Sequence, residues 1–219
     1  MPHSTQPSLG NILVVFDFDG VIADSLEICA RACIHAARRQ GCTRPLAENP
    51  FADLEQVSFE GLAAKLGLNT RAFAADACGY LEHCREIAPL IPGMAETLRQ
   101  VASNGPLCIL SASPRSTIEP FLRFHGCSGY VCKIISRDIP GSKAAKLMRL
   151  KKTQPPICMI GDGVSDILAA KQAGVPAVGV SWGWQPARVL AEAGAELIAE
   201  TPSDIKYLFR TTIAGLSGE

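Results

Sequence analysis

The sequence has no excess of charge of either sign, because its 21 lysines and arginines equal its 21 aspartates and glutamates and give a formal net charge of zero. Proteins that bind nucleic acid usually carry a basic face, so this balance argues against a nucleic-acid partner. No apolar run is long enough to cross a bilayer, and we expect no membrane span. The start, MPHSTQPSLG, lacks both a basic end and an apolar stretch. We expect a short flexible tail over residues 1–10, not a signal peptide.

Closely paired cysteines are also missing. The nine cysteines are an odd number, and with no signal peptide they argue against a disulfide framework. Cys29 and Cys33 lie near His35, but tetrahedral zinc sites use closer ligand pairs, and no matching second pair follows. Cys108 and Cys158 lie inside apolar runs, as small buried residues do. We therefore expect reduced thiols and a cytoplasmic protein.

The sequence does contain several short apolar segments. Its 219 residues, 47% hydrophobic and 19% charged, suit one globular domain with room for an insert. Segments of this kind, bounded by glycine, proline or polar residues, are typical of strands buried on both faces of a parallel sheet. They occupy residues 11–16 (NILVVF), 107–110 (LCIL), 157–160 (ICMI) and 177–180 (AVGV).

Helical segments separate these strands. One covers residues 93–102, a second begins after Ser113 and Pro114 with Ser113 as its cap, and a third runs from Val164 to Ala173 and ends at Gly174. Alternating strands and helices predict an α/β fold. We expect a Rossmann-like, three-layer core with a parallel sheet.

Residues 24–91 interrupt this alternation, because they show helical periodicity and no convincing strand. Helices are expected over residues 26–40, 51–66 and 70–87, with Asp24 and Ser25 as caps of the first. The predicted domains are an α/β core of residues 11–23 and 92–219 and a small all-helical cap domain of residues 24–91. An insert after the first strand lies over the edge at which open α/β sheets bind ligands, so it is a candidate lid.

Polar side chains follow the predicted strands and would collect at one edge of the sheet. Several carboxylates at one edge repel one another unless a cation lies among them, and oxygen ligands without histidine or cysteine favour Mg²⁺. A lysine beside a hydroxyl suits the oxygens of a phosphate, and a carboxylate can act as a nucleophile. The residues concerned are Asp17, Asp19, Ser111, Lys143, Asp162 and Asp166.

Four segments that carry these residues, VVFDFDGV, CILSAS, GSK and MIGDGVSD, resemble in this order the four motifs of the haloacid-dehalogenase-like hydrolase superfamily. The resemblance is strongest to the branch of phosphoglycolate phosphatases and β-phosphoglucomutases, which carries a helical cap between its first two motifs. The stretches IPGMAETL and DILAAKQAGVPAVGVSWGW also resemble that branch. The resemblance implies a Mg²⁺-dependent phosphatase that hydrolyses a small phosphorylated metabolite through an aspartyl-phosphate.

The resemblance also implies roles for the carboxylates. Asp17 would attack phosphorus, and Asp19 would protonate the leaving oxygen and then take a proton from water. Carboxylates two residues apart on an extended segment point the same way, so both can reach one phosphoryl group. The Mg²⁺ ion would be held by Asp17, by the backbone carbonyl of Asp19 and by Asp162.

The other motif residues would serve the phosphate. Ser111 and Lys143 would bind its oxygens, although Lys146 lies near enough in sequence to leave the choice of lysine open. Asp166 would steady the metal water or Lys143, or would merely cap a helix. Gly20 would let the chain turn tightly after the two aspartates.

The sequence leaves the substrate open. The segment at residues 56–61 falls where relatives present specificity residues, yet it has no arginine for a second anion. This weakens the case for a phosphosugar mutase and leaves the carboxylate of phosphoglycolate without a clear partner. A mutase, a 2-haloacid dehalogenase-like hydrolase and a noncatalytic binding module remain alternatives, and Asp19 and Asp162 favour phosphoryl transfer. The roles of Trp182 and Trp184 and the choice between monomer and homodimer also stay open.

Overall fold

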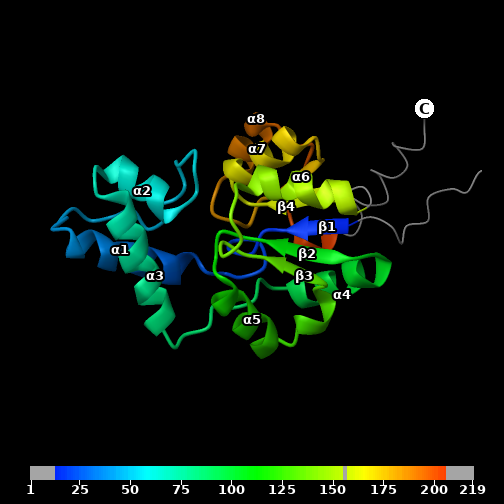
Figure 1. Ribbon diagram of the computed structural model, residues 1–219, viewed down its shortest axis with the longest axis horizontal. Helices are drawn as coiled ribbons and strands as arrows, with labels where there is room; N and C mark the ends of the chain where they lie inside the picture. The colour runs from blue at the N-terminus through cyan, green and yellow to red at the C-terminus, as the bar shows by residue number, and fades with distance from the viewer. Residues whose placement is uncertain (1–12, 155–156, 206–219) are drawn as a thin grey trace, which may run out of the picture.

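The computed structural model describes residues 13–154 and 157–205, so the tail predicted for residues 1–10 lies outside the described part (Figure 1). Six parallel strands form one sheet in the order β3-β2-β1-β4-β5-β6. The four strands predicted from the sequence are confirmed, and β3 and β6 are added at the two edges. The strands are β1 (Leu13–Phe16), β2 (Leu107–Leu110), β3 (Lys133–Ile135), β4 (Ile157–Gly161), β5 (Ala177–Val180) and β6 (Leu197–Ala199).

Helices cover both faces of this sheet. In Figure 1, α6, α7 and α8 lie on one face, and α4 and α5 lie on the other. The helices are α1 (Leu26–Arg39), α2 (Phe59–Leu66), α3 (Thr70–His83), α4 (Met94–Asn104), α5 (Arg115–Phe124), α6 (Lys143–Thr153), α7 (Val164–Ala173) and α8 (Ala187–Ala193), with a short 3₁₀ helix at Ser128–Tyr130.

Strand β1 shows why the core has three layers. Successive side chains of a strand point to opposite faces, and all four residues of β1 are buried. Leu13 and Val15 pack with the helices of one face, and Val14 and Phe16 pack with those of the other. The predicted Rossmann-like fold is therefore confirmed.

Helix α3 packs against both α1 and α2, and the three helices share a hydrophobic cluster that includes Phe51, Leu62 and Phe73. They lie beyond the ends of the strands, at the end of the sheet toward which the strand arrows point (Figure 1). The two linking segments meet, because Asp24 N donates to Pro89 O at 2.8 Å and Ile91 N donates to Ile22 O at 3.0 Å. The chain thus leaves and re-enters the α/β core at a single place.

The helix predicted over residues 51–66 is wrong in its first half, because α2 begins at Phe59 after an N-cap at Ser58. The amide of Gln185 explains the difference. Its Nε2 atom donates to main-chain carbonyls that a helix would need as acceptors, and this fixes the segment against the core instead. The carbonyls belong to Phe51 (3.4 Å), Ala52 (3.2 Å) and Leu54 (2.8 Å). Helix α3 also ends earlier than predicted, at His83.

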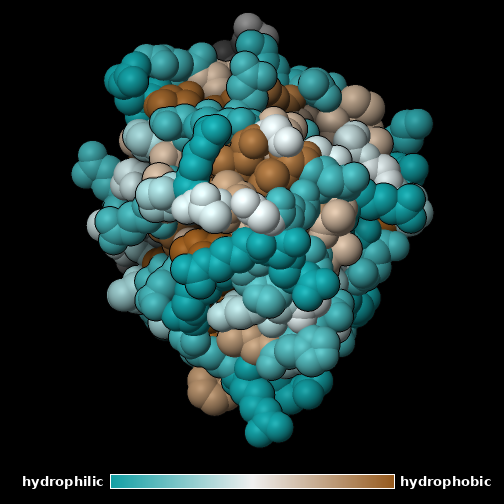
Figure 2. Space-filling model, turned by 90° about the vertical axis from the view of Figure 1, so that its left-hand side faces the viewer, coloured by the Kyte–Doolittle hydropathy of each residue, from teal (hydrophilic) through white to brown (hydrophobic). Residues whose placement is uncertain are grey.

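The surface formed by the α1–α3 end of the molecule is mostly hydrophilic, with hydrophobic residues showing in separate areas (Figure 2). Within the described ranges, no helix has the length and apolar character needed to cross a membrane. All nine cysteines are free thiols.

Candidate active site

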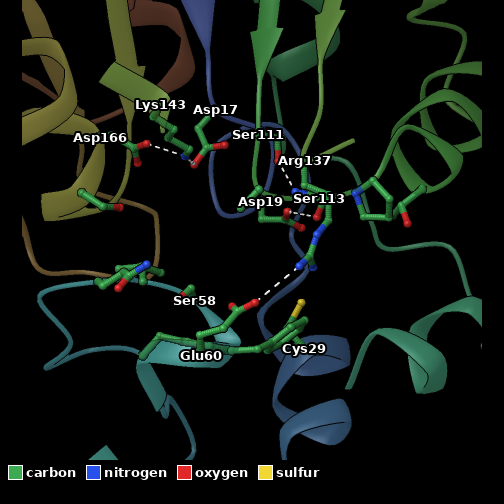
Figure 3. Close-up of a pocket in the computed structure, with 18 of the residues that line it drawn as sticks. Asp17, Asp19, Cys29, Ser58, Glu60, Ser111, Ser113, Arg137, Lys143 and Asp166 are labelled. Atoms are coloured by element: carbon green, nitrogen blue, oxygen red, sulfur yellow. Dashed lines mark hydrogen bonds and ion pairs between the residues drawn. The ribbon is translucent and has the colours of Figure 1, made fainter. Parts of the chain in front are cut away.

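A cavity of about 490 Å³ lies between the strand ends and helices α2 and α3 (Figure 3). This volume falls in the range of small-molecule sites. All six residues singled out in the sequence line it, namely Asp17, Asp19, Ser111, Lys143, Asp162 and Asp166. The structure therefore brings the four motifs together at one place.

The sheet topology explains this convergence. Strand β1 is paired with β2 on one side and with β4 on the other, so the strand order reverses direction here. Open α/β sheets bind ligands in the crevice at such a point. Asp17 directly follows β1, and its N–H donates to Ile160 O at 2.8 Å. Asp162 directly follows β4, so the two carboxylates are neighbours by topology.

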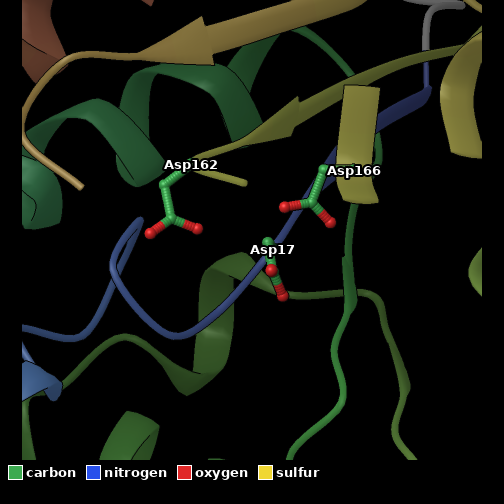
Figure 4. Close-up of side chains that lie close together, drawn as sticks. All are labelled: Asp17, Asp162 and Asp166. Atoms are coloured by element: carbon green, nitrogen blue, oxygen red, sulfur yellow. The ribbon is translucent and has the colours of Figure 1, made fainter. Parts of the chain in front are cut away.

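Three buried carboxylates form an acidic group at this point (Figure 4). Ligand oxygens of Asp17, Asp162 and Asp166 all lie within 4.8 Å of one another. Burial, together with repulsion from Asp166, raises the pKa of Asp17 well above its ordinary value. The same causes raise the pKa of Asp162 to about 7.

This donor set fits a hard divalent cation. All three side chains offer oxygen, and their mutual repulsion would be relieved by a positive charge among them. Lys143 supplies one positive charge for three carboxylates. The residues present therefore fit the Mg²⁺ ion that the sequence resemblance implies.

Lys143 links two members of the acidic group. Its Nζ atom donates to Asp17 Oδ2 at 2.7 Å and to Asp166 Oδ1 at 2.5 Å. Burial alone would lower the pKa of Lys143, but these two carboxylates raise it above its ordinary value. Lys146 points elsewhere, since its Nζ atom donates to Ser136 O at 3.0 Å. Of the two lysines, Lys143 is thus the one that contacts the acidic group.

Asp19 lies in different surroundings. The hydroxyl of Ser25 donates to its Oδ1 at 2.7 Å, and the hydroxyl of Ser113 donates to its Oδ2 at 2.5 Å. Both serines were predicted as helix caps, and neither side chain caps a helix. The partly buried carboxylate of Asp19 needs donors more than an exposed helix end does, because the helix end can bond to water. Burial raises the pKa of Asp19.

The remaining motif residues shape the edge of the cavity. The Ser111 hydroxyl is buried and accepts a hydrogen bond from Ser113 N at 2.9 Å. Asp166 also accepts from Gly163 N at 3.2 Å, so it caps α7 while it holds Lys143. Gly20, where a tight turn was predicted, has a φ of +72°, a left-handed conformation that glycine adopts without a steric penalty.

The two tryptophans have different positions. Trp184 lines the cavity, its main-chain N–H donates to Asp162 Oδ2 at 2.7 Å, and its ring stacks on Phe51 with centroids 4.6 Å apart. Trp182 instead packs against the sheet core and donates from Nε1 to Val21 O at 3.2 Å. Trp184 therefore joins the insert to the acidic group.

Sequence reasoning missed Arg137, which follows β3 and extends across the cavity toward α2 (Figure 3). Without a predicted strand before it, this residue could not be placed at the sheet edge.

Comparisons with known proteins agree with this geometry. Residues 13–174 match the family model of haloacid dehalogenase-like hydrolases. A phosphoglycolate phosphatase of Synechococcus elongatus is 33% identical over 202 residues, which cover 88% of this chain and 94% of that protein. A phosphoglycolate phosphatase of Vibrio vulnificus is 26% identical, with coverage of 86% and 92%.

Solved structures show the same fold. A haloacid dehalogenase-like family hydrolase from Streptococcus pneumoniae superimposes with a TM-score of 0.78 at 21% identity and covers 92% of this chain and 99% of its own. A hydrolase from Pseudomonas syringae gives a TM-score of 0.74 at 22% identity, with coverage of 91% and 98%. Since the family model matches most of the chain, this protein belongs to the haloacid dehalogenase-like hydrolases.

Proposed function

We propose that this protein is a Mg²⁺-dependent phosphatase that hydrolyses a small phosphate monoester through an aspartyl-phosphate on Asp17. One observation carries the proposal. Two carboxylates line one cavity in different surroundings, Asp17 beside Lys143 in the acidic group and Asp19 between two serine hydroxyls. Two carboxyl groups whose surroundings differ suit two different tasks, one as nucleophile and one as proton donor and acceptor.

The reaction has two steps. A carboxylate oxygen of Asp17 bonds to phosphorus as the ester oxygen leaves, and Asp19 gives that oxygen a proton. Water then attacks the phosphorus of the aspartyl-phosphate as Asp19 takes a proton from this water. The bond between Asp17 and phosphorus breaks, inorganic phosphate is released, and the Asp17 carboxylate is regenerated. Lys143 and the Ser111 hydroxyl bind the peripheral phosphate oxygens and stabilise their negative charge.

The ion would be held by Asp17, the backbone carbonyl of Asp19 and Asp162, while Asp166 positions Lys143. When bound, Mg²⁺ neutralises charge on the phosphoryl group and so permits an anionic substrate to meet an anionic nucleophile. The main-chain N–H of Trp184 holds Asp162 in place for this role.

Residues 24–91 would form a cap over a core of residues 11–23 and 92–219. The paired linkers at residues 22–24 and 89–91 suit a hinge, because the insert is joined to the core at this one place in the chain. A cap that closes over the cavity would exclude water and select the substrate.

The named relatives favour phosphoglycolate or a similar small phosphate ester as the substrate. A mutase would transfer the phosphoryl group to a sugar, a dehalogenase would release halide from a 2-haloacid, and a binding module would turn over neither. Release of inorganic phosphate from an ester therefore separates the proposal from all three.

The proposal predicts a strict dependence on metal. With a panel of phosphorylated hydroxy acids and sugar phosphates, we expect Mg²⁺-supported phosphate release, a fall of at least about tenfold in excess EDTA, and recovery when Mg²⁺ is restored. Calcium should inhibit, because its larger and looser coordination shell spoils the alignment of attack. Phosphate release is measured colorimetrically, and full activity in EDTA would rule out the metal-dependent mechanism.

Gly183 provides a test of Asp162 in which no carboxylate is itself replaced. A Cβ atom at Gly183 would lie 2.1 Å from Asp162 Cβ, so Gly183→Ala must displace that side chain. We expect a rise in the Mg²⁺ concentration for half-maximal activity, and a fall in kcat, of roughly 10- to 100-fold. Gly129→Ala is the matched control, because a Cβ there meets nothing within 4 Å. If both variants show the same metal dependence and the same thermal stability, Asp162 does not bind the metal.

A further inference from the structure

Arg137 is a cation in the active-site cavity that the proposed phosphoryl chemistry does not use. It follows β3, and its main-chain N–H donates to Ser113 O at 3.1 Å. The backbone of Arg137 is therefore fixed next to Ser113, whose hydroxyl donates to Asp19. The guanidinium extends from there toward α2 and α3 (Figure 3). Arg137 therefore lies on the side of the cavity that faces the insert, away from Lys143.

The partners of the guanidinium are weak ones. One nitrogen, Nη2, lies 3.4 Å from Glu60 Oε1, which is long for a charge-assisted hydrogen bond. The other, Nη1, donates to Cys78 Sγ at 3.0 Å. Burial raises the pKa of Cys78, so the sulfur is a neutral thiol and a poor acceptor. A planar group with five N–H donors thus has most of its capacity unused.

The other cations that line the cavity are committed. Lys143 contacts Asp17 and Asp166, and Lys146 is buried against the carbonyl of Ser136. The side chain of Arg137 is 36% exposed and that of Glu60 is 43% exposed, so an incoming ligand can reach the pair. An anion at the insert side of the cavity would find its partner in Arg137.

We propose that Arg137 is a specificity-determining residue that binds a second anionic group of the substrate, a carboxylate or a second phosphate, while the transferred phosphoryl group lies at Asp17. The substrate class is then a phosphate monoester of a small acid. This inference rests on the proposed function of the same site. It also supplies, from the core, the arginine that the segment at residues 56–61 lacks.

Glu60 takes the place of the substrate anion until the substrate binds. The Glu60 carboxylate forms only a long contact with Arg137, 3.4 Å between Oε1 and Nη2. A substrate carboxylate that forms two parallel hydrogen bonds with the guanidinium would therefore displace Glu60. Glu60 therefore competes with the substrate. Removing its charge should strengthen the binding of anionic substrates, and removing the charge of Arg137 should weaken it.

An ion pair that merely holds the insert closed would behave differently. In that case Arg137→Gln and Glu60→Gln would break the same contact and change activity in the same direction. They would also affect charged and neutral substrates alike. The direction of the two effects, and their dependence on substrate charge, thus separate recognition from simple closure.

The experiment compares substrates that differ only in charge. The probes are phosphoglycolate and 3-phosphoglycerate, each beside its neutral carboxamide, assayed for kcat/KM with Mg²⁺. We expect Arg137→Gln to reduce the preference for acid over amide by about 10- to 100-fold, the scale of a hydrogen bond between charged groups. Glu60→Gln should increase this preference at least about twofold. Arg115→Gln is the matched control, since Arg115 is paired with Glu119 outside the cavity.

Binding provides a readout that does not depend on turnover. In the Asp17→Asn background, titration calorimetry should show tighter binding of the acid than of the amide, and Arg137→Gln should abolish the difference. An acid preference that Arg137→Gln leaves unchanged, in both kinetics and binding, overturns the inference while the phosphatase function stands. If no probe releases phosphate, the proposed function fails, and the binding difference still decides the role of Arg137.

Discussion

Replacing Asp17 by asparagine is expected to abolish phosphate release. An amide has no anionic oxygen with which to form the acyl-phosphate, and its geometry is otherwise nearly the same. The expected fall in kcat is on the order of 10⁵–10⁶-fold, the scale seen when the nucleophile of a hydrolase is removed. The measurement is single-turnover phosphate release at saturating Mg²⁺, with intact mass to exclude reversion by deamidation.

The fold should survive this change. Burial raises the pKa of Asp17, which means that the folded protein disfavours the charged form. A neutral amide removes that cost, and its carbonyl oxygen can still accept the hydrogen bond from Lys143. In metal-free buffer the midpoint of thermal unfolding should therefore be unchanged or higher.

Asp53→Asn is the matched control for Asp17→Asn, because the side chain of Asp53 is 87% exposed and its distance to Lys65 is 3.8 Å. This variant should keep wild-type turnover. Residual activity of Asp17→Asn within about tenfold of wild type, with no deamidated species, would mean that another group attacks phosphorus.

The sequence predicted the inner part of the sheet because its signals are local. Strands β1, β2 and β5 are apolar runs in which every residue is buried, and β4 is buried over Cys158, Met159 and Ile160. Each of the four strands is followed by a polar residue. Since parallel strands end at one edge, the sequence alone predicts that Asp17 and Asp162 lie together. The same reasoning located the cavity that contains both.

The edge of the sheet could not be predicted in this way. Strands β3 and β6 are three residues long, and β3 begins with the exposed Lys133, so neither stands out from a loop. Missing β3 also concealed Arg137, which owes its position to that strand. Short edge strands are specified by their neighbours in the fold rather than by their own residues.

Contacts between distant segments account for the other errors. Ser25 is at the N-cap of α1 and Ser113 lies one residue before the N-cap of α5, and only the fold reveals that their hydroxyls face Asp19. The segment after Pro50 has helical periodicity, but Gln185, more than 100 residues away, binds its carbonyl groups. Local propensity is a weak guide wherever a buried polar side chain competes for the backbone.

Replacing Asp19 by asparagine should separate the two steps of the proposed reaction. The nucleophile and the main-chain carbonyl of residue 19 remain in place, and only the proton carrier is lost. The amide can keep the local structure, because its oxygen can accept from one serine and its nitrogen can donate to the other. We therefore expect a folded protein whose defect is confined to proton transfer.

The size of the defect should depend on the leaving group. p-Nitrophenyl phosphate needs little help from an acid, so Asp19→Asn should form the aspartyl-phosphate from it and then stall, because hydrolysis needs a base. General acid–base help is typically worth roughly 10²–10⁴-fold, and the second step should slow by that factor. With an alkyl phosphate, whose leaving group is poor, the first step should slow as well.

The observation that distinguishes Asp19 is a burst of p-nitrophenol equal to the enzyme concentration, together with phosphate trapped on Asp17 and seen by intact mass. Ser113→Ala, which removes one of the two hydroxyls that hold Asp19, should give a milder defect of the same kind. The carboxylate of Asp19 is retained in this variant but is less well positioned. If Asp19→Asn hydrolyses substrates with good and with poor leaving groups at the wild-type rate, Asp19 does not transfer the proton in the reaction. The two carboxylates would then not divide the reaction between them, and the site would resemble that of a hydrolase that needs no general acid.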